Sequence, residues 1–364
     1  TGPQGPQGTD GATGPQGPAG TDGAIGPSDA ITCSSLITGT VTANGISLDS
    51  VTDVISYLLA QLGGDIDGEA AIDQSGGSVS LSGDGTRVAI GAKSNSGNGG
   101  AGHVRVYEYT NNAWTQLGGD IDGEAANDQS GYSVSLSGDG YRVAIGAITN
   151  DGNGDDSGHV RVYEYRSGIN AWTQLGGDID GEAASDQSGY SVSLSDDGNR
   201  VAIGAIYNDG GNGVDSGHVR VDSGHVRVYA YRSGINAWTQ LGGDIDGEAA
   251  GDQSGWSVSL SNDGNRVAIG AITNDGNGDD SGHVRVYEYT NNAWTQLGGD
   301  IDGEAANDQS GYSVSLSGDG YRVAIGAITN DGNGDDSGHV RVYEYRSGIN
   351  AWTQLGGDID GEAA

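Results

Sequence analysis

An acidic, glycine-rich loop recurs three times in this sequence, and its oxygen-bearing side chains have a spacing that suits a metal ion. The loop reads NDGNGDDSGH, so Asp, Asn and Asp stand at alternate positions. Oxygen ligands at positions i, i+2 and i+4 of a Gly-rich loop suit Ca²⁺. The candidate ligands are Asp151, Asn153 and Asp155; Asp275, Asn277 and Asp279; and Asp331, Asn333 and Asp335.

The same loop also departs from a complete calcium loop. The sixth position, where a glycine is expected, is Asp156, and the twelfth, where an acid is expected, is Val162. The corresponding loop of the first sequence repeat, residues 62–116, reads NSGNGGAGH and carries no acid. Two interpretations stay open, a calcium site and a solvated turn, and the departures favour the turn. We therefore expect that no cofactor is required and that Ca²⁺ is the one candidate.

The histidines form a second repeated pattern. All of them lie in the word GHVRV, and each is followed two places later by Arg on the same strand face. No Cys stands nearby, so the pattern favours a structural His-Arg-Tyr ladder between repeats over a metal site. The histidines are His103, His159, His218, His225, His283 and His339.

Catalysis is not indicated by any of these groups. An active site requires particular groups with shifted pKa values at one place, and that breaks the symmetry of a repeat. The rounds are nearly identical and contain no unique His, Cys or acid cluster. Trp256 stands where other rounds have Gly or Tyr, and it is either a ligand contact or a tolerated aromatic exchange. We expect a protein that is not an enzyme.

The elements that position these groups are set by an internal repeat. The word LGGDIDGEAA recurs along the chain and defines repeats at 62–116, 117–174, 175–240, 241–296 and 297–354, with a partial copy at 355–364. Residues 102–184 are identical to residues 282–364. Looking for such periods comes first, because they reveal a repeat architecture.

Each repeat contains four short candidate strands separated by Gly, Asp, Asn and Ser. In the second repeat they are GYSVSLS (131–137), RVAIGA (142–147), GHVRVYEY (158–165) and AWTQLG (171–176). Four short strands per repeat predict an all-β fold, a β-propeller of four-stranded antiparallel blades, and a linear stack of sheets is the alternative. Five blades are visible, either as a complete ring or as part of a larger one.

These repeats resemble the FG-GAP repeat of integrin alpha subunits and related surface proteins. The resemblance covers about 62–364 and rests on GYSVSLSGDGYRVAIGA followed by GHVRVYEY. It implies a propeller fold. The family's calcium-binding turn needs several acids, whereas each repeat here keeps one, so the resemblance does not imply that metal site. The single acids are Asp84, Asp139, Asp197, Asp263 and Asp319.

The first part of the chain has a different period. From Gly2 to Ser28 every third residue is Gly, and all five Pro directly follow a Gly, which predicts a collagen-like triple-helical stalk over 1–28. Residues 29–61 predict a hairpin around Asn44-Gly45 and a short amphipathic helix, either a trimerising neck or a cover for the next domain. We expect a homotrimer through the stalk.

Composition excludes some partners and leaves others open. With 50 acids, 15 bases and a net charge of -35, the chain is not expected to bind nucleic acid, and no apolar run long enough for membrane insertion occurs. The chain begins at Thr1 and lacks Met, which is expected of a processed or partial product. The favoured function is adhesion outside the cell, or on a cell or virion surface, to a protein or glycan ligand. A glycan-cleaving propeller and a structural fibre are the alternatives.

Overall fold

The computed structural model describes residues 41–43, 46–48, 61–209 and 223–362. The chain divides into two units, Thr1–Leu62 and Gly63–Ala364. In the first unit, β1 (Val41–Ala43) pairs antiparallel with β2 (Ile46–Leu48), at the place where a hairpin is expected. The predicted stalk over 1–28 and the predicted neck helix lie outside the described residues. Within the described residues, no helix is long and apolar enough to cross a membrane.

The second unit consists of five sheets of one design, each built from four antiparallel strands in chain order. The first strands are β3 (Ser78–Leu81), β8 (Ser133–Leu136), β13 (Ser191–Leu194), β18 (Ser254–Leu260) and β23 (Ser310–Leu316). The second strands are β4 (Arg87–Ala92), β9 (Arg142–Ala147), β14 (Arg200–Ala205), β19 (Arg266–Ala271) and β24 (Arg322–Ala327). The third are β5 (His103–Thr110), β10 (His159–Arg166), β15 (His225–Arg232), β20 (His283–Thr290) and β25 (His339–Arg346). The fourth are β6 (Ala113–Gln116), β11 (Ala171–Gln174), β16 (Ala237–Gln240), β21 (Ala293–Gln296) and β26 (Ala351–Gln354).

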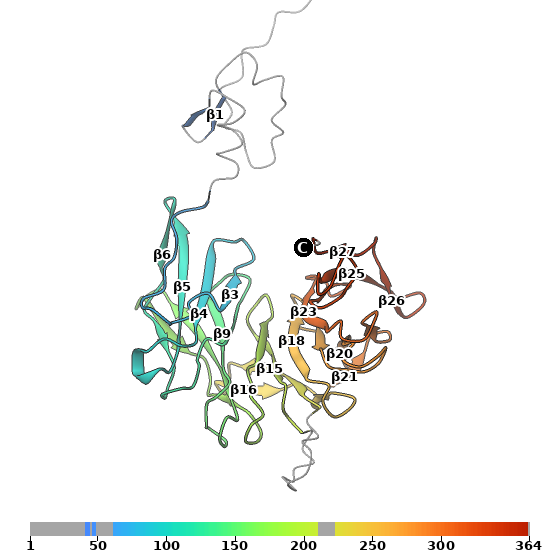
Figure 1. The fold of residues 1–364 in the computed structure, drawn as a ribbon. Helices are drawn as coiled ribbons and strands as arrows, with labels where there is room; N and C mark the ends of the chain where they lie inside the picture. The colour runs from blue at the N-terminus through green and yellow to red at the C-terminus, as the bar shows by residue number, and fades with distance from the viewer. Residues whose placement is uncertain (1–40, 44–45, 49–60, 210–222, 363–364) are drawn as a thin grey trace, which may run out of the picture. The chain divides into compact units, whose positions relative to one another are not determined.

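These sheets are blades of the β-propeller type, and we number them 1 to 5 in chain order. Figure 1 shows them side by side, from blue at blade 1 to red at blade 5. Among the described residues the one helical element is a short 3-10 turn, η2 (Gly97–Gly99). The predicted all-β class and the predicted four-stranded antiparallel blades are therefore confirmed.

A fifth, two-residue strand completes each sheet. It lies in the linker after the fourth strand and pairs with the first half of the third strand; in blade 2, Ile179 of β12 stands opposite Val160. The isoleucine of this strand is buried in blades 1 to 4, so the Ile-Asp pair of the GDIDGE word is part of the sheet. The five short strands are β7 (Ile121–Asp122), β12 (Ile179–Asp180), β17 (Ile245–Asp246), β22 (Ile301–Asp302) and β27 (Ile359–Asp360).

The apolar core lies between blades and not within them. At the seam between blades 2 and 3, Val160, Val162 and Ile179 of blade 2 pack with Val192 and Leu194 of blade 3. The same arrangement recurs at the other three seams between consecutive blades. Because a single sheet buries neither face alone, each blade depends on its neighbours for burial.

Glycine allows the blades to approach closely at each seam. A Cβ added to Gly146 of blade 2 would lie only 2.1 Å from the carbonyl oxygen of Gly189 in blade 3. Gly189 itself has a φ of +92°, in the left-handed region that favours glycine. Ser133 Oγ donates a 2.7 Å hydrogen bond to that same carbonyl. Gly146 and Gly189 therefore face each other across the seam, where a side chain on either would not fit.

Candidate functional site

The predicted His-Arg-Tyr ladder is present and fastens the seams. In blade 2, the buried Arg161 donates from Nη2 to the carbonyl oxygen of Asp122 in the preceding linker, at 2.9 Å. Its Nη1 lies 3.3 Å from Glu124 Oε1, and its guanidinium lies 5.5 Å from the Tyr163 ring centroid. The same contacts recur at Arg105, Arg227, Arg285 and Arg341. Charge-assisted bonds of this kind hold each linker on the next blade.

A Glu-His-Asp group stands beside each of these arginines. In blade 2, Glu124, His159 and Asp178 place ligand-type atoms within 4.8 Å of one another. Burial, and next the charge of Arg161, lower the pKa of His159 to about 4, so its imidazole is neutral at neutral pH. The five groups are Glu69, His103 and Asp120; Glu124, His159 and Asp178; Glu182, His225 and Asp244; Glu248, His283 and Asp300; and Glu304, His339 and Asp358.

The Glu-His-Asp groups fit a cation poorly. The carboxylate of Glu124 already pairs with the guanidinium of Arg161, and a metal ion would place further positive charge beside that group. Sequence reasoning identified the His and Arg of this cluster but not Glu124 and Asp178. The available signal was the recurrence of the GGDIDGE word before and after GHVRV in every repeat.

The predicted calcium loops have internal partners. Asp151 Oδ1 accepts a hydrogen bond from the backbone N–H of Asp156, at 2.9 Å. The Asn153 side-chain amide donates to the carbonyl oxygens of Gly181 and Glu182, both at 2.9 Å. Asn153 therefore holds the loop between β9 and β10 against the linker that follows blade 2. The same bonds are formed by Asp275 and Asn277 in blade 4, and Asp331 and the Gly361 bond of Asn333 repeat them in blade 5.

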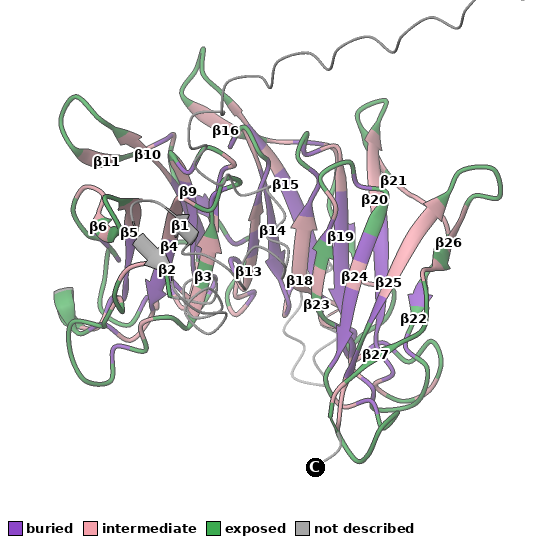
Figure 2. Cartoon of the chain, turned by 90° about the horizontal axis from the view of Figure 1, so that it is seen from above, coloured by how far each residue is buried: buried purple, intermediate pink, exposed green. Residues whose placement is uncertain are grey.

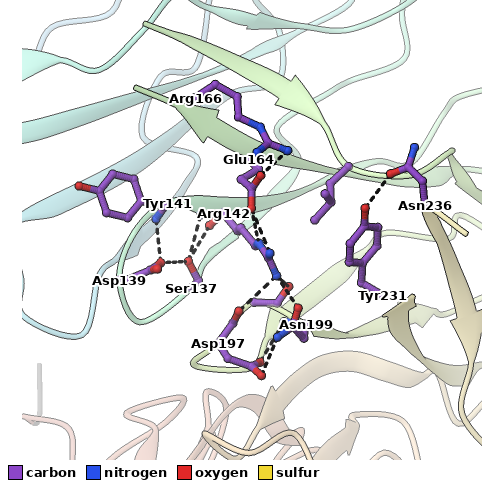
Figure 3. A network of polar contacts seen from close by, with 12 residues as sticks. Ser137, Asp139, Tyr141, Arg142, Glu164, Arg166, Asp197, Asn199, Tyr231 and Asn236 are labelled. Carbon is purple, nitrogen blue, oxygen red and sulfur yellow. Dashed lines mark hydrogen bonds and ion pairs between the residues drawn. The ribbon is translucent and has the colours of Figure 1, made fainter. Parts of the chain in front are cut away.

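The single acid of each FG-GAP-like turn closes that turn. Asp139 Oδ1 accepts hydrogen bonds from Ser137 Oγ at 2.6 Å and from the Tyr141 N–H at 2.9 Å (Figure 3). In blade 1, Asp84 accepts equivalent bonds from Ser82 and Thr86, and these bonds lower its pKa to about 2. The turn carboxylates are thus occupied by donors of their own turns.

The same end of the blades carries a network that joins blades 2 and 3. Arg142 forms an ion pair with Glu164 at 3.0 Å and donates to Asn199 Oδ1 in blade 3 at 2.6 Å (Figure 3). Beside it, Tyr141, Arg166 and Ile169 line a shallow depression of about 580 Å³. The matching depression of blade 5 has a volume of about 620 Å³. Both depressions are shallow and open to solvent, and neither forms a deep pocket.

The other end of the first strands carries a row of aromatic rings that crosses four blades. The ring of Tyr190 lies 5.1 Å from that of Tyr132 and 4.9 Å from that of Trp256, and Tyr312 follows at 5.5 Å from Trp256. The ammonium of Lys93, in blade 1, lies 4.5 Å from the Tyr132 ring centroid and continues the row. Burial raises the pKa of the Tyr190 phenol, so this ring stays uncharged. We call Tyr132, Tyr190, Trp256 and Tyr312 the aromatic row.

The aromatic row is the strongest candidate for a binding surface. Its members are half-buried or exposed, so each ring is fixed on one side by its neighbours and open on another. Tyr and Trp offer a large contact area with few rotatable bonds and are enriched at binding hot spots. Sequence reasoning singled out Trp256 alone. The tyrosines were not recognised because their neighbours come from other repeats.

Comparison with known proteins agrees with this architecture. Residues 121–163, 245–287 and 301–343 match the FG-GAP repeat. Each match runs from a short linker strand into the third strand of the next blade, in blades 2, 4 and 5. The chain thus contains three FG-GAP repeats on blades of the propeller type. No curated protein matches the sequence.

The chain is also similar to solved structures. The periplasmic gluconolactonase PpgL of Pseudomonas aeruginosa is 15% identical with a TM-score of 0.50, over 80% of this chain and 73% of that one. Hydrazine synthase of Kuenenia stuttgartiensis is 14% identical with a TM-score of 0.48, over 80% and 69%. A putative 6-phosphogluconolactonase of Bacteroides uniformis is 11% identical with a TM-score of 0.46, over 79% and 86%. At 15% identity the likeness to PpgL concerns the fold alone.

Proposed function

We propose that this protein is a non-enzymatic adhesion protein that presents the aromatic row to a protein or glycan ligand on a surface. The proposal rests on the continuity of the aromatic row. Neighbouring rings contact each other across four blades, at Tyr132, Tyr190, Trp256 and Tyr312. A ligand that stacks on several rings gains contact area at little cost in side-chain entropy, because the rings already hold one another in place.

A non-catalytic role is supported by the repetition of the polar groups. Each Glu-His-Asp group stands beside an arginine that pairs with its glutamate, in the same setting at every blade. Two carboxyl groups that share catalysis are normally held in different environments, so that one is an acid and the other a base. A repeated, ion-paired arrangement serves the seams better than it serves hydrolysis.

The stalk is the second part of the proposal. The G-x-y period of residues 1–28 supports a triple helix, and hence three sets of blades on one stalk outside the cell or on a cell or virion surface. Linking three weak sites raises their effective concentration and can increase avidity by about 10²-fold. Light scattering at nanomolar concentration is expected to show a threefold loss of mass when residues 1–28 are removed. The same number of chains per particle with and without residues 1–28 would refute the stalk.

The binding test uses an array of immobilised glycans and two matched variants. Trp256→Ala removes the centre of the aromatic row, whereas Tyr141→Ala removes an exposed tyrosine at the other end of the blades. We expect the glycan signal to fall at least tenfold, on the order of one hot-spot residue, for Trp256→Ala and to stay unchanged for Tyr141→Ala. Equal binding by both variants would refute the row as the site. Release of sugar product would instead support the glycan-cleaving alternative.

A further inference from the structure

The two ends of the row of blades expose sheet faces that a neighbouring blade covers at the other blades. In β3 of blade 1, Val79 and Leu81 are 63% and 60% exposed. Their counterparts in β8 of blade 2, Val134 and Leu136, are 9% and 6% exposed because blade 1 covers them. Figure 2 shows exposed residues on β3, at one end of the row.

Blade 5 exposes the opposite kind of face. Val340 and Ile359 are 36% and 61% exposed, whereas their blade 2 counterparts, Val160 and Ile179, are 0% and 5% exposed. Ile328, which follows β24, is also exposed. We call the side of a blade that packs on the preceding blade its front face, and the side that packs on the following blade its back face. Blade 1 thus leaves its front face open, and blade 5 leaves its back face open.

The two open faces are copies of the two sides of a seam that the structure contains. Residues 102–184 and 282–364 are identical, so the back of blade 5 has the sequence of the back of blade 2. The back of blade 2 packs against β13 of blade 3, whose sequence is SVSL. The open strand of blade 1, β3, has the same sequence, SVSL. The front of blade 1 therefore fits the back of blade 5 as blade 3 fits blade 2.

The polar groups of the two open faces are complementary as well. Across the seam between blades 2 and 3, Ser133 Oγ donates to the Gly189 carbonyl, the Leu194 N–H donates to Ser135 Oγ, and the Gly138 N–H donates to the Asp196 carbonyl. In the described part of the chain, the matching groups of blade 5 and blade 1 form no such bond to another blade. These groups are Ser313 Oγ, Ser315 Oγ and the Gly318 N–H in blade 5, and the Gly76 carbonyl, the Leu81 N–H and the Gly83 carbonyl in blade 1, whereas the Gly83 N–H and the Gly318 carbonyl already bond to the inner neighbouring blade.

An arginine shows the same incompleteness. The Arg142 side chain is 19% exposed and reaches Asn199 of the next blade, whereas its blade 5 counterpart, Arg322, is 61% exposed and contacts Glu344 of its own blade. The apolar residues, the hydrogen-bonding groups and Arg322 of blade 5 would therefore all be covered by a following blade.

We propose that a second copy of this chain docks head to tail, with the front face of its blade 1 on the back face of blade 5. The contact reproduces the seam between blades 2 and 3, with Thr86 of blade 1 at the position of Asn199. It also brings together two copies of the word LGGDIDGEAA, at 62–71 and 355–364, where an internal seam holds one. Since the words are identical, either can pair with β25 while the other is displaced. Such a heterologous contact builds a closed ring or an open filament, depending on the rotation it imposes.

The test is analytical ultracentrifugation of the full chain at micromolar concentration, with one face blocked at a time. Leu81→Asp blocks the front face and Val340→Asp blocks the back face, and the double variant defines the mass without end-to-end contact. We expect the wild type to exceed that mass and each single variant to equal it. An equimolar mixture of the two single variants should associate again, because each retains the face that the other lacks. Ile328→Asp replaces Val340→Asp if the latter fails to give a folded protein by circular dichroism.

Two outcomes would overturn the proposal. A wild-type mass equal to that of the double variant, up to millimolar concentration, would show that another protein or an internal closure covers these faces. Association of either single variant alone would show a symmetric contact instead. Glycan binding through the aromatic row is measured separately and is expected to be unchanged in both single variants, so failure of one proposal leaves the other testable.

Discussion

Blade 2 and blade 5 have the same sequence in different surroundings. Val160 is fully buried in blade 2, and the identical position in blade 5, Val340, is 36% exposed. The second and third strands and their register are nevertheless the same, with Val160 opposite Gly146 and Val340 opposite Gly326. The comparison shows that a blade obtains its strands from local sequence and its burial from the next blade.

The strongest test of this comparison is a matched pair of substitutions. Val160→Asp places a carboxylate at a fully buried site without a partner, and we expect it to lower the free energy of unfolding by about 3–5 kcal/mol. Val340→Asp makes the same change where solvent is accessible, and about 1 kcal/mol or less is expected at low protein concentration. Urea unfolding followed by circular dichroism compares the two. Equal losses would mean that blade 5 is covered in solution.

The interior seams should also be sensitive to acid. His159 and His283 have pKa values lowered to about 4, chiefly by burial, whereas an unfolded histidine titrates near 6.5. The unfolded chain therefore binds the proton first, and stability is lost as the pH falls from about 6.5 to about 4. We expect a loss of roughly 2 kcal/mol per histidine between about pH 7 and about pH 5.

Histidine substitution identifies the source of this pH dependence. His159→Gln should lower stability at neutral pH but reduce its slope between about pH 6.5 and about pH 4, as measured by urea unfolding across that range. An unchanged slope would assign the effect to other groups and would contradict the burial of a neutral imidazole at the seam.

A smaller difference is expected from one hydrogen bond. Ser133 Oγ donates across a seam to Gly189, and its counterpart Ser313 has no described neighbouring blade. Ser133→Ala should cost about 1 kcal/mol and Ser313→Ala close to none, by thermal unfolding of the two variants in parallel. A cost at Ser313 comparable with that at Ser133 would indicate that its face is occupied.

The smallest expected effect concerns calcium, and it should be the same in both blades. Asp151 and Asp331 each accept a hydrogen bond from an N–H of their own loop. We therefore expect a chelator to leave the melting temperature unchanged in scanning calorimetry. A clear fall in melting temperature, restored by added Ca²⁺, would instead support the metal interpretation of these loops.

Much of the fold could be predicted from local sequence. The second strand of blade 2 was expected at 142–147 and spans Arg142–Ala147, and the third was expected at 158–165 and spans His159–Arg166. Turn residues bound these strands, and alternating β-prone residues fill them, so neighbours in sequence carry the signal. The two-residue strand β12 (Ile179–Asp180) was missed because a single isoleucine between acids is too short to show a period.

The candidate site was less accessible to sequence reasoning. Trp256 stood out as an exception in its repeat, but Tyr132 and Tyr190 looked like ordinary strand residues. Their contact joins residues from different repeats, and no local pattern encodes which repeats become neighbours. The same limit applies to Glu124 and Asp178, which meet His159 only after the linkers fold onto the blades.

The sequence by itself determined the strands, the turns, the five repeats and the glycines that allow the blades to touch. The tertiary structure alone decided which of these identical segments are buried. Two copies of the same residues, 102–184 and 282–364, differ at Val160 and Val340 because apolar burial depends on what covers a face, and the residues of that face do not encode it.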